Sequence, residues 1–460
     1  MTSVPNLRRP LSGSSAWAVI VALALTCACN PSRKLPTDTG TDRQQEEVTR
    51  VYNPVTGQYE AVKDPLSLVD TIDWQEVIDQ PVISSAESAT SGKKDRYALA
   101  FMLPLQANLH RGFGDEIPAR TRRFLNYYAG MRLALADLTR RGIDLDVRVL
   151  DTEESTDVVR QQLRELRDVD LIVGPYDRDA IREAAEFGAR YRIPVVSPWT
   201  PSITLEYPNQ QLVQMVPGLR THAAAAIEFI GQRFLNPRIY IVARDDRERS
   251  RFAGYHAAQA QYNPGLERVE ELMIYDATVD LAKTNLDTLI HDTRPTVFIL
   301  PYFSRNDEEF VGALLRKLHA EKLERNVTVF GLPQWINFSR LNPDYLESLQ
   351  THITAAQHVD WANEATRRFS KDFYDAYAGI PEPSGKQGYD LVMFLGESLK
   401  AHGVPFMEPV AGQPSPHGDI LLRPVRDESA RPDGDFPVLY YENQGIQVLQ
   451  FTDQAYQIVH

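Results

Sequence analysis

Residues 171–198 read LIVGPYDRDAIREAAEFGARYRIPVVSP, and this stretch decides the fold class. It opens with the apolar run 171–173, which a Gly-Pro pair ends, and it contains a second apolar run at 193–196. Short apolar runs between turn residues are typical of strands that are buried on both faces of a sheet. Residues 178–190 predict a helix, so the stretch reads as a strand, a crossover helix and a parallel strand.

The same alternation extends in both directions and restarts after about residue 217. It predicts an α/β fold of two doubly wound lobes, with a ligand cleft between the carboxyl ends of their sheets. The other expected strands are 97–103, 145–150, 239–242, 272–275, 296–300, 327–330, 438–441 and 446–451. The other expected helices are one that carries Tyr127, Met131, Leu135 and Leu138, then 156–167, 221–234, 250–262, 279–291, 307–324, 364–377 and 389–402.

The N-terminus has the pattern of a lipoprotein leader. Arg8 and Arg9 precede an apolar run at 16–25, which is too short to span a bilayer. We expect a signal peptide over 1–28 and lipidation at Cys29, because a small residue precedes this cysteine. The alternative is an ordinary leader in which both cysteines are incidental. The expected location is the cell envelope, lipid-anchored on the periplasmic side, with the outer membrane favoured over the inner.

Residues 29–95 are polar and predict a flexible tether. Within it, 50–62 alternates apolar and polar residues around a turn at 53–57, which suits either a small hairpin or an extended arm. Beyond the tether, we expect 96–217 and 336–403 to form the first lobe. We expect 218–335 and 404–460 to form the second.

Composition narrows the function classes. The formal charge is −13, and the exported part reaches −15 because the leader removes two arginines and no acids. Such a surface disfavours nucleic acid as a partner. Cys27 and Cys29 are the only cysteines, so the body can carry no disulfide, thiol nucleophile or cysteine metal site. The sequence has no nucleophile elbow or phosphate loop, and we expect no enzyme activity, cofactor or metal.

Five stretches carry a family resemblance in the same order along the chain. They are 98–104, 128–135, DLIVGP at 170–175, IPVVSP at 193–198 and QGYD at 387–390. From residue 96 to the end, about four fifths of its length, the chain resembles type I periplasmic binding proteins of the branched-chain amino acid receptor branch. The resemblance implies two lobes joined by a multi-strand hinge. It also implies a small-molecule ligand in the cleft and an ABC importer as a partner.

The tail at 441–448, YENQGIQV, is similar to a subgroup of lipoproteins in which this domain sits beside peptidoglycan-binding modules. This similarity implies an alternative function. The same fold would then be a scaffold or regulator of peptidoglycan synthesis, with cell-wall synthesis proteins as partners and a degenerate cleft.

The resemblance also implies which loops would hold a ligand. They are 174–179 and 197–201 in the first lobe, and 244–250 and 301–306 in the second. The family usually has serines where this chain has Asp177 and Arg178, so we expect a more charged binding site than in those relatives. The expected ligand class is an amino acid, a peptide or a cell-wall fragment. The candidate ligand-binding residues are Tyr176, Asp177, Arg178, Ser197, Trp199, Thr200, Arg249 and Tyr302.

Each candidate also has a structural alternative. The arginines suit a salt-bridged rim, Ser197 and Thr200 suit a helix cap, and Trp199 suits packing inside its lobe. A binding protein requires Trp199 and Tyr302 to face an open, polar cleft. A scaffold requires a filled cleft and an exposed apolar patch elsewhere.

Overall fold

The computed structural model describes residues 49–53, 58–62, 93–109, 117–201, 203, 205, 207–265, 268–275, 281, 283–426 and 437–460. The chain divides into two units, residues 1–85 and 86–460. In the first unit, β1 (Thr49–Asn53) and β2 (Gln58–Val62) pair as an antiparallel hairpin, which is one of the two structures expected there. The expected lipidation site, Cys29, lies outside the described residues. No helix among the described residues is long and apolar enough to cross a membrane.

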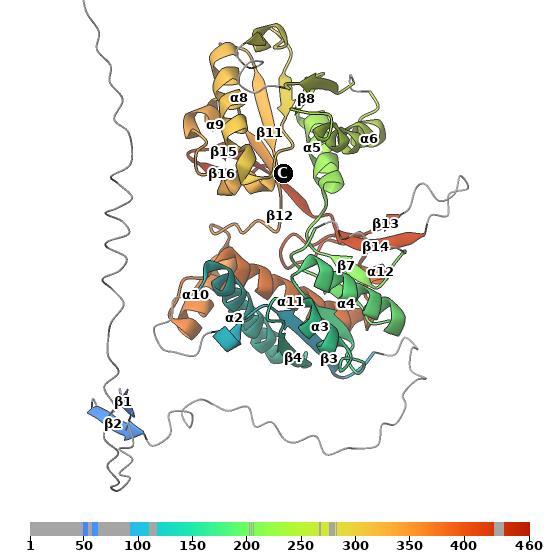
Figure 1. Cartoon of the computed structure of the whole chain (residues 1–460), viewed down its shortest axis with the longest axis vertical. Coiled ribbons are helices and arrows are strands. Elements are labelled where there is room, and N and C mark those ends of the chain that lie inside the picture. Colours follow the sequence, from blue (N-terminus) through green and yellow to red (C-terminus); the bar gives the residue numbers. More distant parts are fainter. Residues whose placement is uncertain are drawn as a thin grey trace, which may run out of the picture. The chain divides into compact units, whose positions relative to one another are not determined.

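The first lobe is built on a sheet whose described strands run in the order β13-β14-β7-β6-β5-β3-β4 (Figure 1). Neighbours pair in parallel except β13 and β14, so the crossover unit expected at 171–198 is present as β5, α4 and β6. The strands are β3 (Tyr97–Leu103), β4 (Leu145–Asp151), β5 (Leu171–Val173), β6 (Val195–Ser197), β7 (Leu212–Gln214), β13 (Leu422–Arg426) and β14 (Val438–Asn443). The helices are α2 (Ala119–Arg140), α3 (Thr156–Leu163), α4 (Arg178–Tyr191), α10 (Glu364–Tyr377), α11 (Pro383–His402) and α12 (Met407–Val410).

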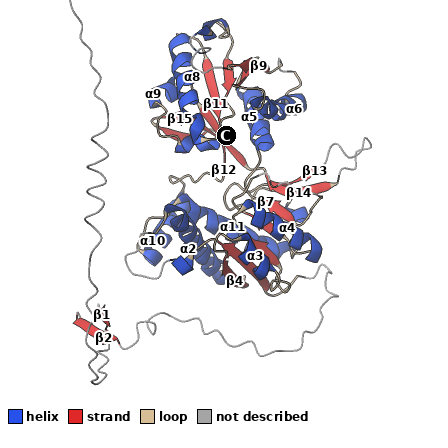
Figure 2. Ribbon diagram, viewed as in Figure 1, coloured by secondary structure: helices blue, strands red, loops and turns tan. Residues whose placement is uncertain are grey.

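The second lobe repeats this plan with described strands in the order β16-β15-β12-β11-β10-β8-β9 (Figure 2). Its strands are β8 (Arg238–Ala243), β9 (Glu270–Met273), β10 (Thr296–Ile299), β11 (Val327–Gly331), β12 (His352–Ala356), β15 (Ile446–Thr452) and β16 (Ala455–Ile458). Its helices are α5 (Leu219–Arg233), α6 (Phe252–Tyr262), α8 (Glu308–Glu321) and α9 (Pro343–Ser348). Within the helix expected at 279–291, the described residues 281 and 283 are helical, and a short 3-10 turn follows at Leu286–Thr288.

The chain passes between the lobes after β7, after β12 and after β14. This division differs from the boundaries expected from the sequence. Residues 352–356 pair with β11, so the second lobe extends past residue 336 to the end of β12. Residues 438–443 pair with β7, so the tail after residue 404 first completes the first lobe. The pairing of β14 with β7 spans more than 200 residues and has no local sequence signal, which is why the boundary after residue 404 shifted.

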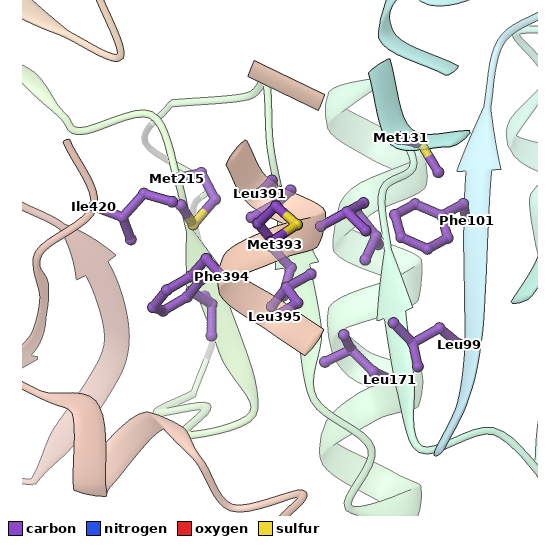
Figure 3. Close-up of a cluster of buried hydrophobic side chains, with 14 of the residues drawn as sticks. Leu99, Phe101, Met131, Leu171, Met215, Leu391, Met393, Phe394, Leu395 and Ile420 are labelled. Atoms are coloured by element: carbon purple, nitrogen blue, oxygen red, sulfur yellow. The ribbon is translucent and has the colours of Figure 1, made fainter. Parts of the chain in front are cut away.

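The core of the first lobe explains how its helices lie on both faces of the sheet. Side chains alternate along β3, so Leu99 and Phe101 pack with α2 and α11, whereas Ala100 and Met102 pack with α3 and α4. Figure 3 shows the first of these clusters, where apolar side chains of α11 meet those of β3 and β5. Helices α2 and α11 approach closely because Gly130 lies against Gly385; a Cβ on Gly130 would be 1.8 Å from the Gly385 carbonyl oxygen.

His222 of α5 ties the start of the second lobe to β12. Its Nδ1 lies 2.9 Å from the Thr354 hydroxyl, and burial lowers the pKa of the imidazole to about 4. In the unfolded chain the pKa returns to about 6.5, so the unfolded state binds more protons below that value. The stability that neutral His222 contributes is therefore complete above about pH 6.5 and decreases as the pH falls towards 4.

We expect His222→Gln to remove this pH dependence. Between pH 7 and pH 5 the wild type should lose on the order of 2 kcal/mol of unfolding free energy relative to the variant. Urea denaturation at both pH values measures the difference. Parallel pH profiles for the two proteins would show that His222 titrates equally in the folded and unfolded states.

Candidate functional site

Two loops of the first lobe, those after β5 and β6, are bonded to each other at the carboxyl end of the sheet. The Thr200 hydroxyl donates a hydrogen bond of 2.6 Å to the carbonyl oxygen of Tyr176. The Ser197 hydroxyl donates to the Thr200 carbonyl oxygen at 3.5 Å, and Ser197 is fully buried. The Thr200 hydroxyl therefore links the two loops, and the Ser197 hydroxyl makes a contact within the second loop. Neither residue is the N-cap of α5, which is Gly218.

Trp199 lies inside the first lobe, in an aromatic cluster. Its ring centroid is 5.1 Å from that of Phe124, 4.9 Å from Tyr127 and 6.2 Å from Tyr176. Phe124 and Tyr127 belong to α2, so the indole packs the loop after β6 against this helix. Trp199 is only 8% exposed. The half-buried Tyr176 forms the outer edge of the cluster, and the Arg120 guanidinium lies over its ring at 4.8 Å.

Asp177 and Arg178 mark the start of α4. An Asp177 carboxylate oxygen accepts hydrogen bonds from the backbone amides of Asp179 and Ala180, so this residue is the N-cap of the helix. Arg178 follows it, is exposed, and has no hydrogen bond or ion pair with another described residue. The Arg178 guanidinium is therefore available to an incoming group.

The second lobe presents an ion-pair cluster around Tyr302 at the carboxyl ends of β8 and β10. Tyr302 is fully buried, and its hydroxyl donates to a Glu248 carboxylate oxygen at 3.0 Å. The Arg244 guanidinium lies 2.5 Å from the carboxylates of both Glu248 and Asp307, and 4.7 Å from the centre of the Tyr302 ring. The side chains of this cluster therefore satisfy one another's charges and hydrogen bonds.

Burial and charge pairing together set the pKa values of the ionisable groups in this cluster. Burial alone would raise the pKa of Glu248, but hydrogen bonds from Arg244 and Tyr302 hold it below its ordinary value. Burial, together with the Glu248 charge, raises the pKa of Tyr302 far above its usual range. Glu248 is thus a carboxylate and Tyr302 a neutral phenol at any physiological pH.

Arg249 lies apart from Tyr302, on the rim of the second lobe. Its guanidinium is half exposed and pairs with the Glu271 carboxylate of β9 at 2.6 Å. The structure therefore brings Tyr176, Ser197, Trp199 and Thr200 together, with Asp177 and Arg178 directly beside them. Arg249 and Tyr302 lie in the other lobe and belong to two different ion-pair groups.

A pocket of about 780 Å³, which no sequence pattern marked, lies between the lobes. Ile336 and Trp361, both exposed, line it from the second lobe and from the segment that links the lobes. Arg123 of α2, which has no ion pair with a described residue, and Ser384 of α11 line it from the first lobe. The Ser384 hydroxyl is buried and finds no hydrogen-bond partner among the described residues. Trp361 stands alone in a polar stretch, so periodicity gave no reason to select it.

Two doubly wound lobes, three linking segments and an interlobe pocket define a two-lobed binding protein of the clamshell class. The chain belongs to the periplasmic binding protein family, because a family model described as Periplasmic binding protein matches residues 124–411. This match confirms the resemblance to type I periplasmic binding proteins. The family implies a periplasmic or envelope location, and its members are in general not enzymes. No curated protein sequence matches the chain.

Solved structures with the same fold include transport and non-transport proteins. A putative branched-chain amino acid ABC transporter protein from Rhodospirillum rubrum has a TM-score of 0.56 at 14% identity, over 79% of this chain and 100% of that one. An ABC transporter substrate-binding protein from Desulfitobacterium hafniense in complex with Leu gives 0.52 at 12%, over 79% and 100%. The C-domain of LpoA from Haemophilus influenzae, a regulator of PBP1A, gives 0.51 at 12%, also over 79% and 100%. At these identities the likeness shows the fold.

Proposed function

We propose that this protein is an envelope docking or regulatory protein whose partner belongs to the cell-wall synthesis machinery. One observation carries the proposal: the loops that would hold a small ligand are filled by the chain's own side chains in both lobes. Trp199 and Tyr302 are buried within their separate lobes by side chains of the protein itself. A transport receptor needs these positions open to its solute.

The cost of opening these positions supports the proposal. An amino-acid zwitterion needs a hydrogen bond or countercharge for each of its charged groups when it leaves water. The Thr200 hydroxyl is engaged with Tyr176, and the Tyr302 hydroxyl with Glu248. Arg244 is bonded to two carboxylates, and separating such a partly buried group costs several kcal/mol.

An exposed apolar patch on the first lobe supports docking. Tyr374, Tyr377 and Ile380 are exposed at the end of α10, and Leu125 is exposed on α2. The Tyr377 hydroxyl donates to the Ala129 carbonyl oxygen at 3.2 Å, so the end of α10 lies against α2. Exposed apolar groups gathered in this way are typical of protein interaction sites. The fold shared with LpoA, a regulator of PBP1A, makes a peptidoglycan synthase the partner class that we propose.

We propose further that Cys29 carries a lipid anchor that holds the domain at the periplasmic side of a membrane, with the outer membrane favoured. The motif that supports this is the leader ending in Ala28 and Cys29. Mass spectrometry of the mature N-terminus tests it, and an unacylated terminus would exclude the anchor.

The docking proposal is tested in two parts. A thermal-shift screen of the exported chain against amino acids, peptides, muropeptides, nucleosides and organic anions should give no saturable rise in melting temperature. In cells, a photo-crosslinking residue at Tyr374 should form a crosslink with a peptidoglycan synthase. The same residue at Tyr207, which is also exposed, is the matched control and should form none. Equal crosslinking at both positions, or none at Tyr374, would contradict the proposal.

A second function, small-ligand binding, is favoured by the interlobe pocket. Arg123 and the exposed faces of Trp361 and Ile336 suit a ligand with a carboxylate and an apolar group. The ligand-binding roles assigned from the sequence, of which Arg178 and Tyr176 are the more accessible, remain predictions. A saturable shift in the thermal screen that Trp361→Ala removes would favour this function, with an ABC importer as the partner.

A further inference from the structure

A second pocket, of about 520 Å³, shares a wall with the interlobe pocket. The shared wall is the linking segment 357–360 together with Gln387 of α11. The other walls come from α2, α10, α11 and the loop 416–420 of the first lobe, and from Gln447 of β15 and Ile458 of β16 in the second. This hinge pocket therefore contacts both lobes and one of the segments that join them.

The charges that line the hinge pocket are unbalanced. Its permanent cations are Arg141, Arg368 and Lys386, and two of them pair with acids that do not line it. Arg141 lies 2.6 Å from Glu397, and Arg368 lies 3.5 Å from Glu364. The carboxylates that line the pocket are Asp137, which pairs with Arg140 outside it, and Asp360, Asp372, Asp390 and Asp419. The pocket consequently has an excess of negative charge.

The pocket already accommodates one ammonium group of the chain itself. The Nζ of Lys386 lies 2.5 and 2.6 Å from the two carboxylate oxygens of Asp390. The same nitrogen lies 6.0 Å from the ring centre of Phe369 and 5.8 Å from that of Tyr389. A carboxylate and aromatic faces around one ammonium are the chemistry by which proteins recognise organic cations.

A second set of acceptors in this pocket has no cation. Asp419 is half-buried and forms no ion pair with a described residue, although its carboxylate is hydrogen-bonded to the Gln447 side chain; burial and the neighbouring Asp390 charge raise its pKa. The side-chain oxygen of Gln447 is buried and accepts no hydrogen bond from a described residue. Asp419 lines the pocket, so an added cation would give this carboxylate the ion pair that it lacks among the described residues.

We propose that the hinge pocket binds a small organic cation with a primary ammonium group, of which an aliphatic diamine is the simplest example. Asp419 supplies the countercharge, and Phe369 and Tyr389 contact the carbon chain. Because both lobes line the pocket, such a ligand favours the lobe arrangement that keeps these walls together. By linkage, a molecule bound in the interlobe pocket changes the affinity of the hinge pocket for the cation. This inference is independent of the proposed function.

Calorimetric titration of the exported chain with cadaverine tests the site. The wild type should bind, and Asp419→Asn should weaken binding by about tenfold or more, because a hydrogen bond to a charged group is lost. Asp453→Asn makes the same change of charge in the exposed turn between β15 and β16 and should bind like the wild type. Glutarate, a dianion of the same chain length, should not bind.

A second variant, Lys386→Met, should increase the effect of cadaverine, whereas Asp419→Asn should decrease it. Removing the ammonium leaves Asp390 without its cation, so cadaverine should raise the melting temperature of this variant more than that of the wild type. If the variant does not fold, the Asp419→Asn titration still decides. The proposal is overturned if cadaverine gives no binding heat with the wild type. It is also overturned if Asp453→Asn weakens binding as much as Asp419→Asn does, since that would indicate general attraction to an acidic surface.

Discussion

Replacing Trp199 with alanine should lower the free energy of unfolding by about 3–5 kcal/mol, the usual cost of removing a large aromatic side chain from a core. The indole contacts Phe124, Tyr127 and Tyr176 and leaves a cavity between the loop after β6 and α2 when it is removed. Urea denaturation measures the loss. The matched control is Trp361→Ala, which removes a tryptophan that is 40% exposed and should cost about 1 kcal/mol or less.

The Trp199 result also bears on function. A large loss places the indole in the core and supports a cleft whose ligand positions are filled. A loss of less than about 1 kcal/mol would mean that the ring lies free in the cleft, where it could stack on a ligand. That outcome would contradict the docking proposal and favour the receptor.

Arg244→Met should destabilise the second lobe by about 3–5 kcal/mol, because it leaves two largely buried carboxylates without their shared cation. Glu248 and Asp307 both bond to this guanidinium, and Tyr302 lies beneath it. Chemical denaturation measures the loss. Arg249→Met is the control from the same loop; its pair with Glu271 is half exposed, so the variant should lose less than about 1 kcal/mol.

A double variant distinguishes the two ways in which Arg244 can stabilise the second lobe, through its charge and through packing. Glu248→Gln in the Arg244→Met background removes one of the two unpaired charges, so it should recover part of the lost stability. If the double variant is as unstable as the sum of the two single variants, the guanidinium stabilises the lobe through packing on Tyr302 and Phe310 and not through its charge.

Much of the fold could be predicted because its signals are local. The stretch 171–198 gave the strand, helix and strand that the structure contains, and α4 ends within one residue of its expected end. Asp177 begins that helix through a contact that spans three residues, which is the range that sequence patterns describe. The lobe to which β14 belongs was not predictable in the same way, because its partner β7 is distant in sequence.

The candidate site was predictable in its loops but not in the roles of its side chains. The sequence placed Ser197, Trp199 and Thr200 on a loop at the carboxyl end of a strand, and the structure has them there. It did not indicate that the Thr200 hydroxyl bonds to Tyr176, or that Arg244, which was not among the candidates, occupies the second lobe's wall. Trp361 and Ser384 were missed since neither belongs to a periodic pattern or a known loop.

The sequence by itself determined the two α/β lobes, the family and the acidic surface, because these depend on hydrophobic periodicity, turn residues and composition along short stretches. The tertiary structure decided which groups remain available. Trp199 is covered by α2, Tyr302 by Arg244, and the hinge pocket joins Asp390, Asp419 and Gln447 from separate segments. Burial and charge balance depend on which distant residues meet in space, and that is a property of the folded chain.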